Sequence, residues 1–215
     1  MSSPTSRREA GQVNDAIDEA LAAPSPAHRQ RLLQLARASS APEFAERIWR
    51  RATRLGKRHP REGRRLQAAR DGLILALYAS RAPRGWACAW CDGSSTRVGS
   101  RLAAGIGGIV RDAPGAIVAR ISRAIGEHDA LGAELAALAA VMRAAIERGE
   151  RRLCVYTDNR ALVALWNERR DDDRLSVIRG LGAELQRFSL RALPRRHNRA
   201  ADALARSAMA ASPHS

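Results

Sequence analysis

Apolar residues recur at helical spacing in the first part of the chain and at strand spacing later. Val13, Ile17 and Leu21 fall on one face of a helix, and similar spacing marks residues 32–35 and 44–48. Prolines separate these three segments. We therefore expect a polar, mostly helical region of three short helices over residues 1–84.

After a proline- and glycine-containing linker at residues 81–85, short apolar runs alternate with longer mixed segments. The pattern predicts three strands, a helix, a strand, two helices, a strand and a helix. The expected strands are residues 86–91, 104–110, 116–125, 153–157 and 190–193. The expected helices are residues 130–149, 161–166 and 174–188, and a last one capped by Asn198. Pro114 and Gly115 predict a type II turn over residues 113–116. These elements make residues 85–215 an α/β domain.

Basic residues exceed acidic ones in this chain of 215 residues. Lysine and arginine number 37 against 22 aspartates and glutamates, which gives a formal charge of +15. Such an excess indicates a nucleic acid or another polyanionic partner. Arginines cluster between residues 47 and 70, where Glu62 is the only acid. This cluster is either a solvated helix surface or a clamp for phosphates. Trp49 within it is either a buried anchor or a residue that stacks on a base.

The three cysteines are expected to be free and buried. In an extended strand Cys88 and Cys91 point to opposite faces, so their C-x-x-C spacing does not predict a metal or redox pair, and Cys154 is isolated. An odd number of cysteines without a secretory signal indicates a reducing compartment, and we expect a cytoplasmic protein. The apolar run at residues 73–79 is too short to span a bilayer, so no membrane partner is expected.

Four carboxylates lie where a fold can bring them together. Asp92 and Asp158 end two apolar runs, and Glu134 and Asp202 lie inside helical segments. Taken singly, each is also typical of a turn, a helix cap or a solvated helix charge. Acidic groups that share one pocket need a compensating charge, and Mg²⁺ supplies it through oxygen ligands. Two such ions can activate water and stabilise a leaving oxygen during phosphodiester cleavage.

Four sequence blocks resemble the ribonuclease H family, particularly its small reverse-transcriptase-like domains. The blocks are Cys-Asp-Gly-Ser-Ser at residues 91–95, Ala-Glu-Leu-Ala-Ala-Leu at 133–138, Tyr-Thr-Asp-Asn at 156–159, and residues 194–205, which contain Asp202. Their order and spacing match the family over residues 86–211. The resemblance implies a mixed five-stranded sheet flanked by helices, and it leaves the basic helical extension at residues 1–84 outside.

The resemblance also implies an activity and a site. Asp92, Glu134, Asp158 and Asp202 would be the catalytic acids and would hold two Mg²⁺ ions, for which Mn²⁺ can substitute. The implied reaction is endonucleolytic hydrolysis of the RNA strand of an RNA–DNA hybrid, and we expect a monomer. The expected nucleic-acid contacts are Gly93, Ser94, Ser95, Asn159, Arg195, Arg196 and Asn198.

Two departures from the family pattern leave alternatives open. The asparagines that the family places near its first two acids are missing, although serine hydroxyls can also contact a 2′-hydroxyl. The family's loop histidine is missing too, because Ala192 stands ten residues before Asp202. His197 is a further candidate for acid–base catalysis. The alternatives are a nucleic-acid-binding protein of the same fold that cleaves weakly or not at all, and a nuclease with a different nucleic-acid substrate.

Overall fold

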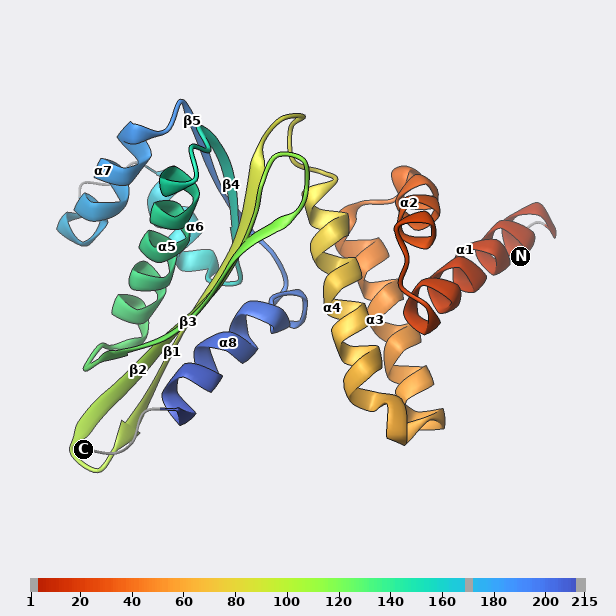
Figure 1. Cartoon of the computed structure of the whole chain (residues 1–215), viewed down its shortest axis with the longest axis horizontal. Coiled ribbons are helices and arrows are strands. Elements are labelled where there is room, and N and C mark those ends of the chain that lie inside the picture. Colours follow the sequence, from red (N-terminus) through yellow and green to blue (C-terminus); the bar gives the residue numbers. More distant parts are fainter. Residues whose placement is uncertain (1–3, 169–171, 212–215) are drawn as a thin grey trace. The chain divides into compact units, whose positions relative to one another are not determined.

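The change from helical to strand spacing divides the structure into a helical unit and a unit built on a sheet (Figure 1). The computed structural model describes residues 4–168 and 172–211. The two units are Met1–Arg81 and Ala82–Ser215, whereas the sequence division was placed after residue 84. Among the described residues, no helix has both the length and the apolar composition needed to cross a bilayer.

The first unit contains the helices α1 (Pro4–Ala22), α2 (Pro26–Leu35), α3 (Ala41–Arg58) and α4 (Gly63–Ala79). Two of them begin at a serine followed by a proline or by an alanine and a proline, which favours a helix start. The Ser25 hydroxyl accepts a hydrogen bond from the backbone of His28. Ser40 and Glu43 form a reciprocal capping box at α3. The three expected helices are therefore confirmed.

The sequence pattern did not separate α4 as a fourth helix. Its apolar residues from Leu73 to Tyr78 are all buried, so this part of the helix has no polar face. The alternation of apolar and polar residues that identifies a helix is therefore missing there. It packs against α3 and α1, whose buried side chains include Phe44, Ile48 and Ile17. The first unit thus has a hydrophobic core of its own.

The second unit contains a mixed five-stranded sheet, as the resemblance implied. Its strands are β1 (Ala87–Val98), β2 (Arg101–Arg111), β3 (Ile117–Gly126), β4 (Arg152–Thr157) and β5 (Arg187–Ala192). Their spatial order is β3-β2-β1-β4-β5. The pairs of β1 with β2 and of β2 with β3 are antiparallel, and those of β1 with β4 and of β4 with β5 are parallel. β1 is therefore the central strand.

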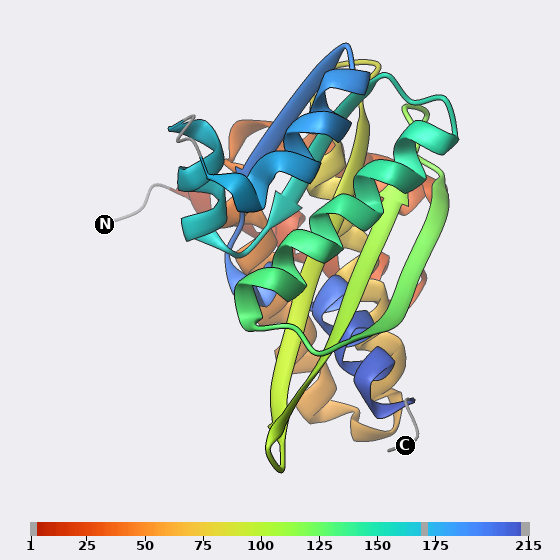
Figure 2. The ribbon, with the colours of Figure 1, turned by 90° about the vertical axis from the view of Figure 1, so that its left-hand side faces the viewer.

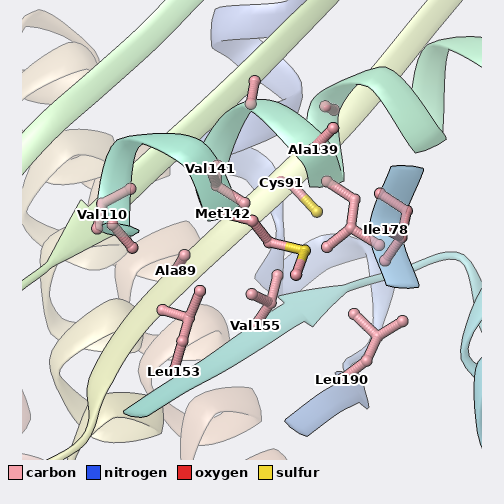
Figure 3. Packing of buried hydrophobic residues seen from close by; sticks show 14 of the residues in the cluster. Ala89, Cys91, Val110, Ala139, Val141, Met142, Leu153, Val155, Ile178 and Leu190 are labelled. Atoms are coloured by element: carbon pink, nitrogen blue, oxygen red, sulfur yellow. The ribbon is translucent and has the colours of Figure 1, made fainter. Parts of the chain in front are cut away.

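Helices cover both faces of this sheet (Figures 1 and 2). On one face lies α5 (Ala130–Glu147), which contacts β1, β2 and α7 (Ser176–Glu184). On the other face lies α8 (Arg199–Ala210), which contacts β1, β2 and β3. The short helix α6 (Arg160–Asn167) contacts β5. Figure 3 shows Met142 of α5 among Val155, Ile178 and Leu190 in the core beneath α5.

Glycines let α8 lie close to the sheet. A Cβ atom on Gly107 of β2 would lie 2.1 Å from the backbone oxygen of Ala201 and 2.4 Å from the backbone nitrogen of Ala205. Only glycine avoids this clash, which explains the Gly-x-Gly pattern of β2. Gly107 is also the partner of Asp92 across the β1–β2 ladder. The close approach therefore brings α8 next to the strand position of Asp92.

Several sequence-based boundaries were wrong, two of them by a wide margin. β1 does not end at Cys91 but continues through Asp92 to Val98, because β2 supplies ladder partners along its whole length. The helix expected over residues 174–188 ends at Glu184, and Phe188 belongs to β5. There the backbone of Gln186 donates to the Arg151 carbonyl at 2.8 Å, so pairing with β4 overrides the apolar helical spacing.

The turn between β2 and β3 lies one residue earlier than expected. The Gly115 amide donates to the Asp112 carbonyl at 2.9 Å, which makes Ala113 and Pro114 the central residues. The Asp112 carboxylate also accepts from the amides of Gly115 and Ala116 at 2.8 and 2.7 Å. This side chain fixes the turn, and Gly115 follows with a φ of +100°.

Candidate metal centre

Three of the four predicted acids converge at one place in the second unit. Asp92, Glu134 and Asp158 each offer a carboxylate oxygen, and these oxygens all lie within 4.8 Å of one another. Asp92 lies in β1, Asp158 directly follows β4, and Glu134 lies in α5. Trp90 pairs with Tyr156 in the parallel ladder, so the two aspartates lie at matching positions two residues further along. The topology therefore places both aspartates at the same edge of the sheet.

Gly93 positions Glu134 against Asp92. A Cβ atom at Gly93 would lie 2.3 Å from the backbone carbon of Ala133 and from the backbone nitrogen of Glu134, so only glycine lets α5 come this close. The Gly93 amide donates a hydrogen bond to the Glu134 carboxylate, which lowers the pKa of that group. The Asp-Gly pair is thus not a turn but a point of contact between strand and helix.

The side-chain amide of Asn198, at the start of α8, contacts the carboxylates of both Asp92 and Asp158. Its Nδ2 lies 2.8 Å from Oδ1 of Asp158, 3.4 Å from Oδ1 of Asp92 and 2.9 Å from the carbonyl oxygen of Cys91. Asn198 is the N-cap residue of α8, as expected, but its side chain makes no capping hydrogen bond. Only 1% of Asn198 is exposed, so the amide proposed from the sequence as a nucleic-acid contact is buried against the carboxylates.

Arg195 offsets only part of the negative charge of this cluster. Burial, followed by the charges of Glu134 and Asp158, raises the pKa of Asp92 to about 9. Burial and the charge of Asp158 raise the pKa of Glu134 to about 7. Within the described part of the chain, Oε2 of Glu134 is buried and has no hydrogen-bond partner. Close carboxylates, raised pKa values and an unpaired oxygen together fit a divalent cation, which prefers oxygen ligands.

The fourth acid is buried nearby but lies outside the group of three. Asp202 of α8 is 8% exposed, and its charge contributes to the raised pKa of Asp92. Its carboxylate forms an ion pair with Arg206 one turn along the helix, and Arg199 lies 3.9 Å away. The sequence predicted the acid, but it did not reveal these two arginines as its partners.

Three further predicted site residues lie close in sequence to the two aspartates. Ser94 is half-buried, and the hydroxyl of Ser95 donates to the His128 carbonyl at 2.7 Å. Oδ1 of Asn159 accepts from the Leu162 amide at 2.9 Å, so Asn159 caps α6 and Asp158 does not.

The segment before α8 contributes one exposed arginine close to the acids. Nε of Arg195 lies 3.9 Å from Oδ2 of Asp158, and the Arg195 side chain is 85% exposed. Arg196 is also exposed. His197 is buried, with 4% of its surface exposed, in the 3₁₀ turn Arg195–His197. This turn therefore presents arginines to solvent and keeps the histidine inside.

A mixed sheet of this order, with acids from β1, α5 and the end of β4 at one edge, defines a ribonuclease H-like domain. A family model described as reverse transcriptase-like matches residues 91–208, a span that contains all four acids. The chain therefore belongs to this family of ribonuclease H-like domains. Among curated proteins, no sequence match is found.

Solved ribonuclease H structures share this fold. The chain is similar to ribonuclease H1 of the halophilic archaeon Halobacterium salinarum, with 26% identity and a TM-score of 0.54, over 60% of this chain and 100% of that one. It is also similar to LC11-RNase H1, isolated from compost and solved in complex with an RNA/DNA hybrid. There the identity is 21% and the TM-score 0.51, over 58% of this chain and 96% of that one. The N-terminal RNase H domain of rv2228c from Mycobacterium tuberculosis is also similar, with 24% identity and a TM-score of 0.50. The similarity covers 57% of this chain and 98% of that one.

Proposed function

We propose that this chain is a divalent-metal-dependent endonuclease that hydrolyses the RNA strand of RNA–DNA hybrids. The observation that carries this proposal is the convergence of Asp92, Glu134 and Asp158, with one buried Glu134 oxygen left unpaired in the described structure. The similarity to an archaeal ribonuclease H1 supports the reaction class. The net charge of +15 supports a polyanionic substrate.

Asp92, Glu134 and Asp158 would hold the cation. When bound, it would supply a water of lowered pKa and positive charge to offset the charge that develops on the phosphate and the leaving oxygen. The Gly93 amide and the Asn198 amide orient these carboxylates through the hydrogen bonds described above. Arg195, exposed beside Asp158, contacts the substrate phosphate and attracts it toward the acids.

We further propose Mg²⁺ as the resident ion, with Mn²⁺ as a substitute, and a second ion that uses Asp202. The arrangement of Asp202 sets a condition for this second ion. Arg206 and Arg199 both approach Oδ2 of its carboxylate, so an ion that binds through this oxygen competes with Arg206. The substrate phosphate offers the arginine another acceptor.

A second candidate function is hybrid binding with weak or no cleavage. The ion pair between Asp202 and Arg206 favours it, because the guanidinium competes with a second metal ion for Oδ2 of Asp202. The presence of the other three acids at mutual ligand distance favours the enzyme. The two candidates differ in one measurable property, which is cutting by the intact protein.

The test is cleavage of an end-labelled RNA–DNA hybrid with and without Mg²⁺. Asp92→Asn and Glu134→Gln should lose at least about 100-fold in rate while they still bind the hybrid. Glu147→Gln is the matched control, since Glu147 is an exposed acid near the end of the same helix as Glu134. Product ends should be 5′-phosphate and 3′-hydroxyl. Binding without cutting by the intact protein, with Mg²⁺ or Mn²⁺, supports the second candidate.

Substrate specificity needs its own comparison. The family's asparagines near the first two acids are absent, and Ser94 and Ser95 stand beside Asp92 instead. The same assay on hybrid, duplex RNA and duplex DNA measures how strictly the RNA strand is selected. Faster cleavage of duplex DNA than of hybrid would contradict the proposed substrate.

A further inference from the structure

The corner where α3 meets α4 in the first unit exposes a group of basic residues that the proposed reaction does not use. We call this group the α3–α4 corner. Its members lie in the last turns of α3, the 3₁₀ turn Pro60–Glu62 and the first turn of α4, and all are exposed: Arg54, Lys57, Arg58, Arg61 and Arg64. In the described structure, none of the five forms a salt bridge.

Neighbouring arginines in the same unit do have acidic partners. Arg50 pairs with Glu46, and Arg51 pairs with Asp18. Glu62, the one acid at the corner, is paired with Arg65. The corner therefore keeps a positive charge that its own surroundings do not neutralise, which is the electrostatic footprint of a polyanion partner.

The charge at the start of α4 works against the stability of that helix. Gly63 is its first residue, no side chain caps it, and Arg64 and Arg65 lie in its first turn, beside the positive end of the helix dipole. By contrast, α3 in the same unit begins with a capping box of Ser40 and Glu43. Positive residues at this position are unfavourable for the free protein and favourable once an anion binds.

The shape and the side chains of the corner suit phosphates better than bases. A shallow hollow of about 420 Å³ is lined by residues 58–62, and a second one of about 240 Å³ lies beside it between α3 and α4, with Lys57 and Arg70 in its lining. The guanidinium of Arg70 lies 3.9 Å above the ring of Trp49, so that face of the ring is covered. Trp49 is half-buried, not fully buried as an anchor would be, but its contact with Arg70 makes base stacking on that face unfavourable.

The corner also lacks what a membrane-binding surface needs. Interfacial helices insert large apolar side chains beside their basic ones. Among the described residues, the exposed large hydrophobic side chains are Ile117 and Val177, and both belong to the second unit. Basic charge without an apolar anchor favours a nucleic-acid backbone over a lipid surface.

We propose that the α3–α4 corner is a second nucleic-acid-binding surface, which contacts the phosphates of a double helix without reading its sequence. The choice of nucleic acid over another polyanion rests on the proposed function of the second unit. Because the contacts are to phosphates, duplex DNA and RNA–DNA hybrid both bind there. A second surface on the same chain raises the affinity for substrate without adding a group to the chemistry.

The test measures binding of the full chain to a labelled duplex DNA by fluorescence anisotropy in EDTA. Without a cation the acidic cluster repels phosphate, so the signal reports on other surfaces. The triple variant R58A/R61A/R64A should bind at least about 10-fold more weakly near 0.1 M salt, and its log–log salt slope should fall by about 2–3. The matched control R143A/R151A/R187A removes three exposed arginines from the second unit and should change affinity less than about 2-fold. Equal losses in both variants would overturn the proposal.

A single variant separates binding from folding. Arg64→Glu places an acid in the first turn of α4, so its Tm should stay unchanged or rise by about 1–3 °C while duplex binding weakens. Unaltered duplex binding in this variant would contradict the proposal. Loss of binding to phosphatidylserine vesicles with duplex binding intact would replace it with a lipid surface.

The binding assay and the cleavage assay test two separate proposals, and either proposal can be contradicted without the other. A chain that binds duplex through the corner but never cuts hybrid contradicts only the proposed nuclease. A chain that cuts hybrid while its corner variants bind like the control contradicts only the second surface.

Discussion

Nδ2 of Asn198 lies 2.8 Å from Oδ1 of Asp158, and this contact links the start of α8 to the end of β4. The same nitrogen reaches Asp92 and the Cys91 carbonyl, so one buried amide holds two carboxylates that would otherwise repel each other. Neighbours that orient metal ligands in this way commonly contribute 10- to 100-fold to metal affinity or activity. The positions of the acids therefore depend on a residue that is not itself acidic.

Asn198→Ala should lower hybrid cleavage by about 10- to 100-fold, because the aspartates lose the donor that orients them. The predicted signature is a higher Mg²⁺ concentration for half-maximal rate, measured by titrating Mg²⁺ at fixed hybrid. Asn159→Ala, which removes the α6 cap instead, is the control and should leave that concentration within about 2-fold. Equal Mg²⁺ requirements in Asn198→Ala and the parent would refute the positioning role.

Gly93→Ala should destabilise the second unit by about 2–4 kcal/mol, because the new methyl group meets the backbone of Ala133 and Glu134 at 2.3 Å. Gly180→Ala is the control within the same unit. A Cβ at Gly180 of α7 meets nothing within 4 Å, and alanine should stabilise the helix by up to about 1 kcal/mol. Urea unfolding of both variants measures the difference. Similar midpoints would show that β1 and α5 are not in such close contact.

The cluster should make the metal-free protein less stable as the pH rises. The pKa values of Glu134 and Asp92 are raised to about 7 and about 9, so above the ordinary carboxyl range the folded state binds more protons than the unfolded chain. Stability is therefore lost as the pH rises from the ordinary carboxyl values toward the raised ones. In EDTA, the Tm difference between Asp92→Asn and the parent should grow from pH 5 to pH 8 by several degrees. A constant difference across this range would contradict the raised pKa values.

Arg206→Ala should make Asp202 available to a cation at a lower metal concentration. The Asp202 carboxylate loses its nearest positive partner, so a divalent ion no longer competes with the guanidinium. We expect the Mn²⁺ concentration for half-maximal cleavage to fall about 2- to 10-fold. Arg143→Ala, which removes an exposed arginine of α5, controls for net charge. A rise in that concentration would mean that Arg206 supports the site instead of competing with the ion.

The two aspartates that follow apolar runs, and the faces to which alternate side chains of β1 point, could be predicted from the sequence. Asp92 and Asp158 follow apolar runs that pair as parallel neighbours. Strand alternation put Cys88 and Cys91 on opposite faces of β1, and of the two Cys91 belongs to the core beneath α5. The family resemblance supplied the fold and the acid in α5. These features are local or pairwise, so they leave a readable pattern in the chain.

Other features depend on contacts between distant residues, which no local pattern records. An asparagine at a helix start is typical of a cap, and only the folded chain brings Asn198 to Asp158. The ion pair of Asp202 with Arg206 has the spacing of an ordinary helix-surface pair. Pairing with β4 likewise decided that Phe188 lies in a strand, although its spacing suited the preceding helix.

Direct binding of Mn²⁺ to the metal-free protein tests the central claim, that Asp92, Glu134 and Asp158 form one cation site. Titration followed by electron paramagnetic resonance of free Mn²⁺ counts the bound ions. At least one ion per chain should bind to the parent and to Glu147→Gln, and Asp92→Asn and Asp158→Asn should lose it. Equal Mn²⁺ binding by these two variants and the parent, or none by the parent up to about 10 mM, would contradict the account.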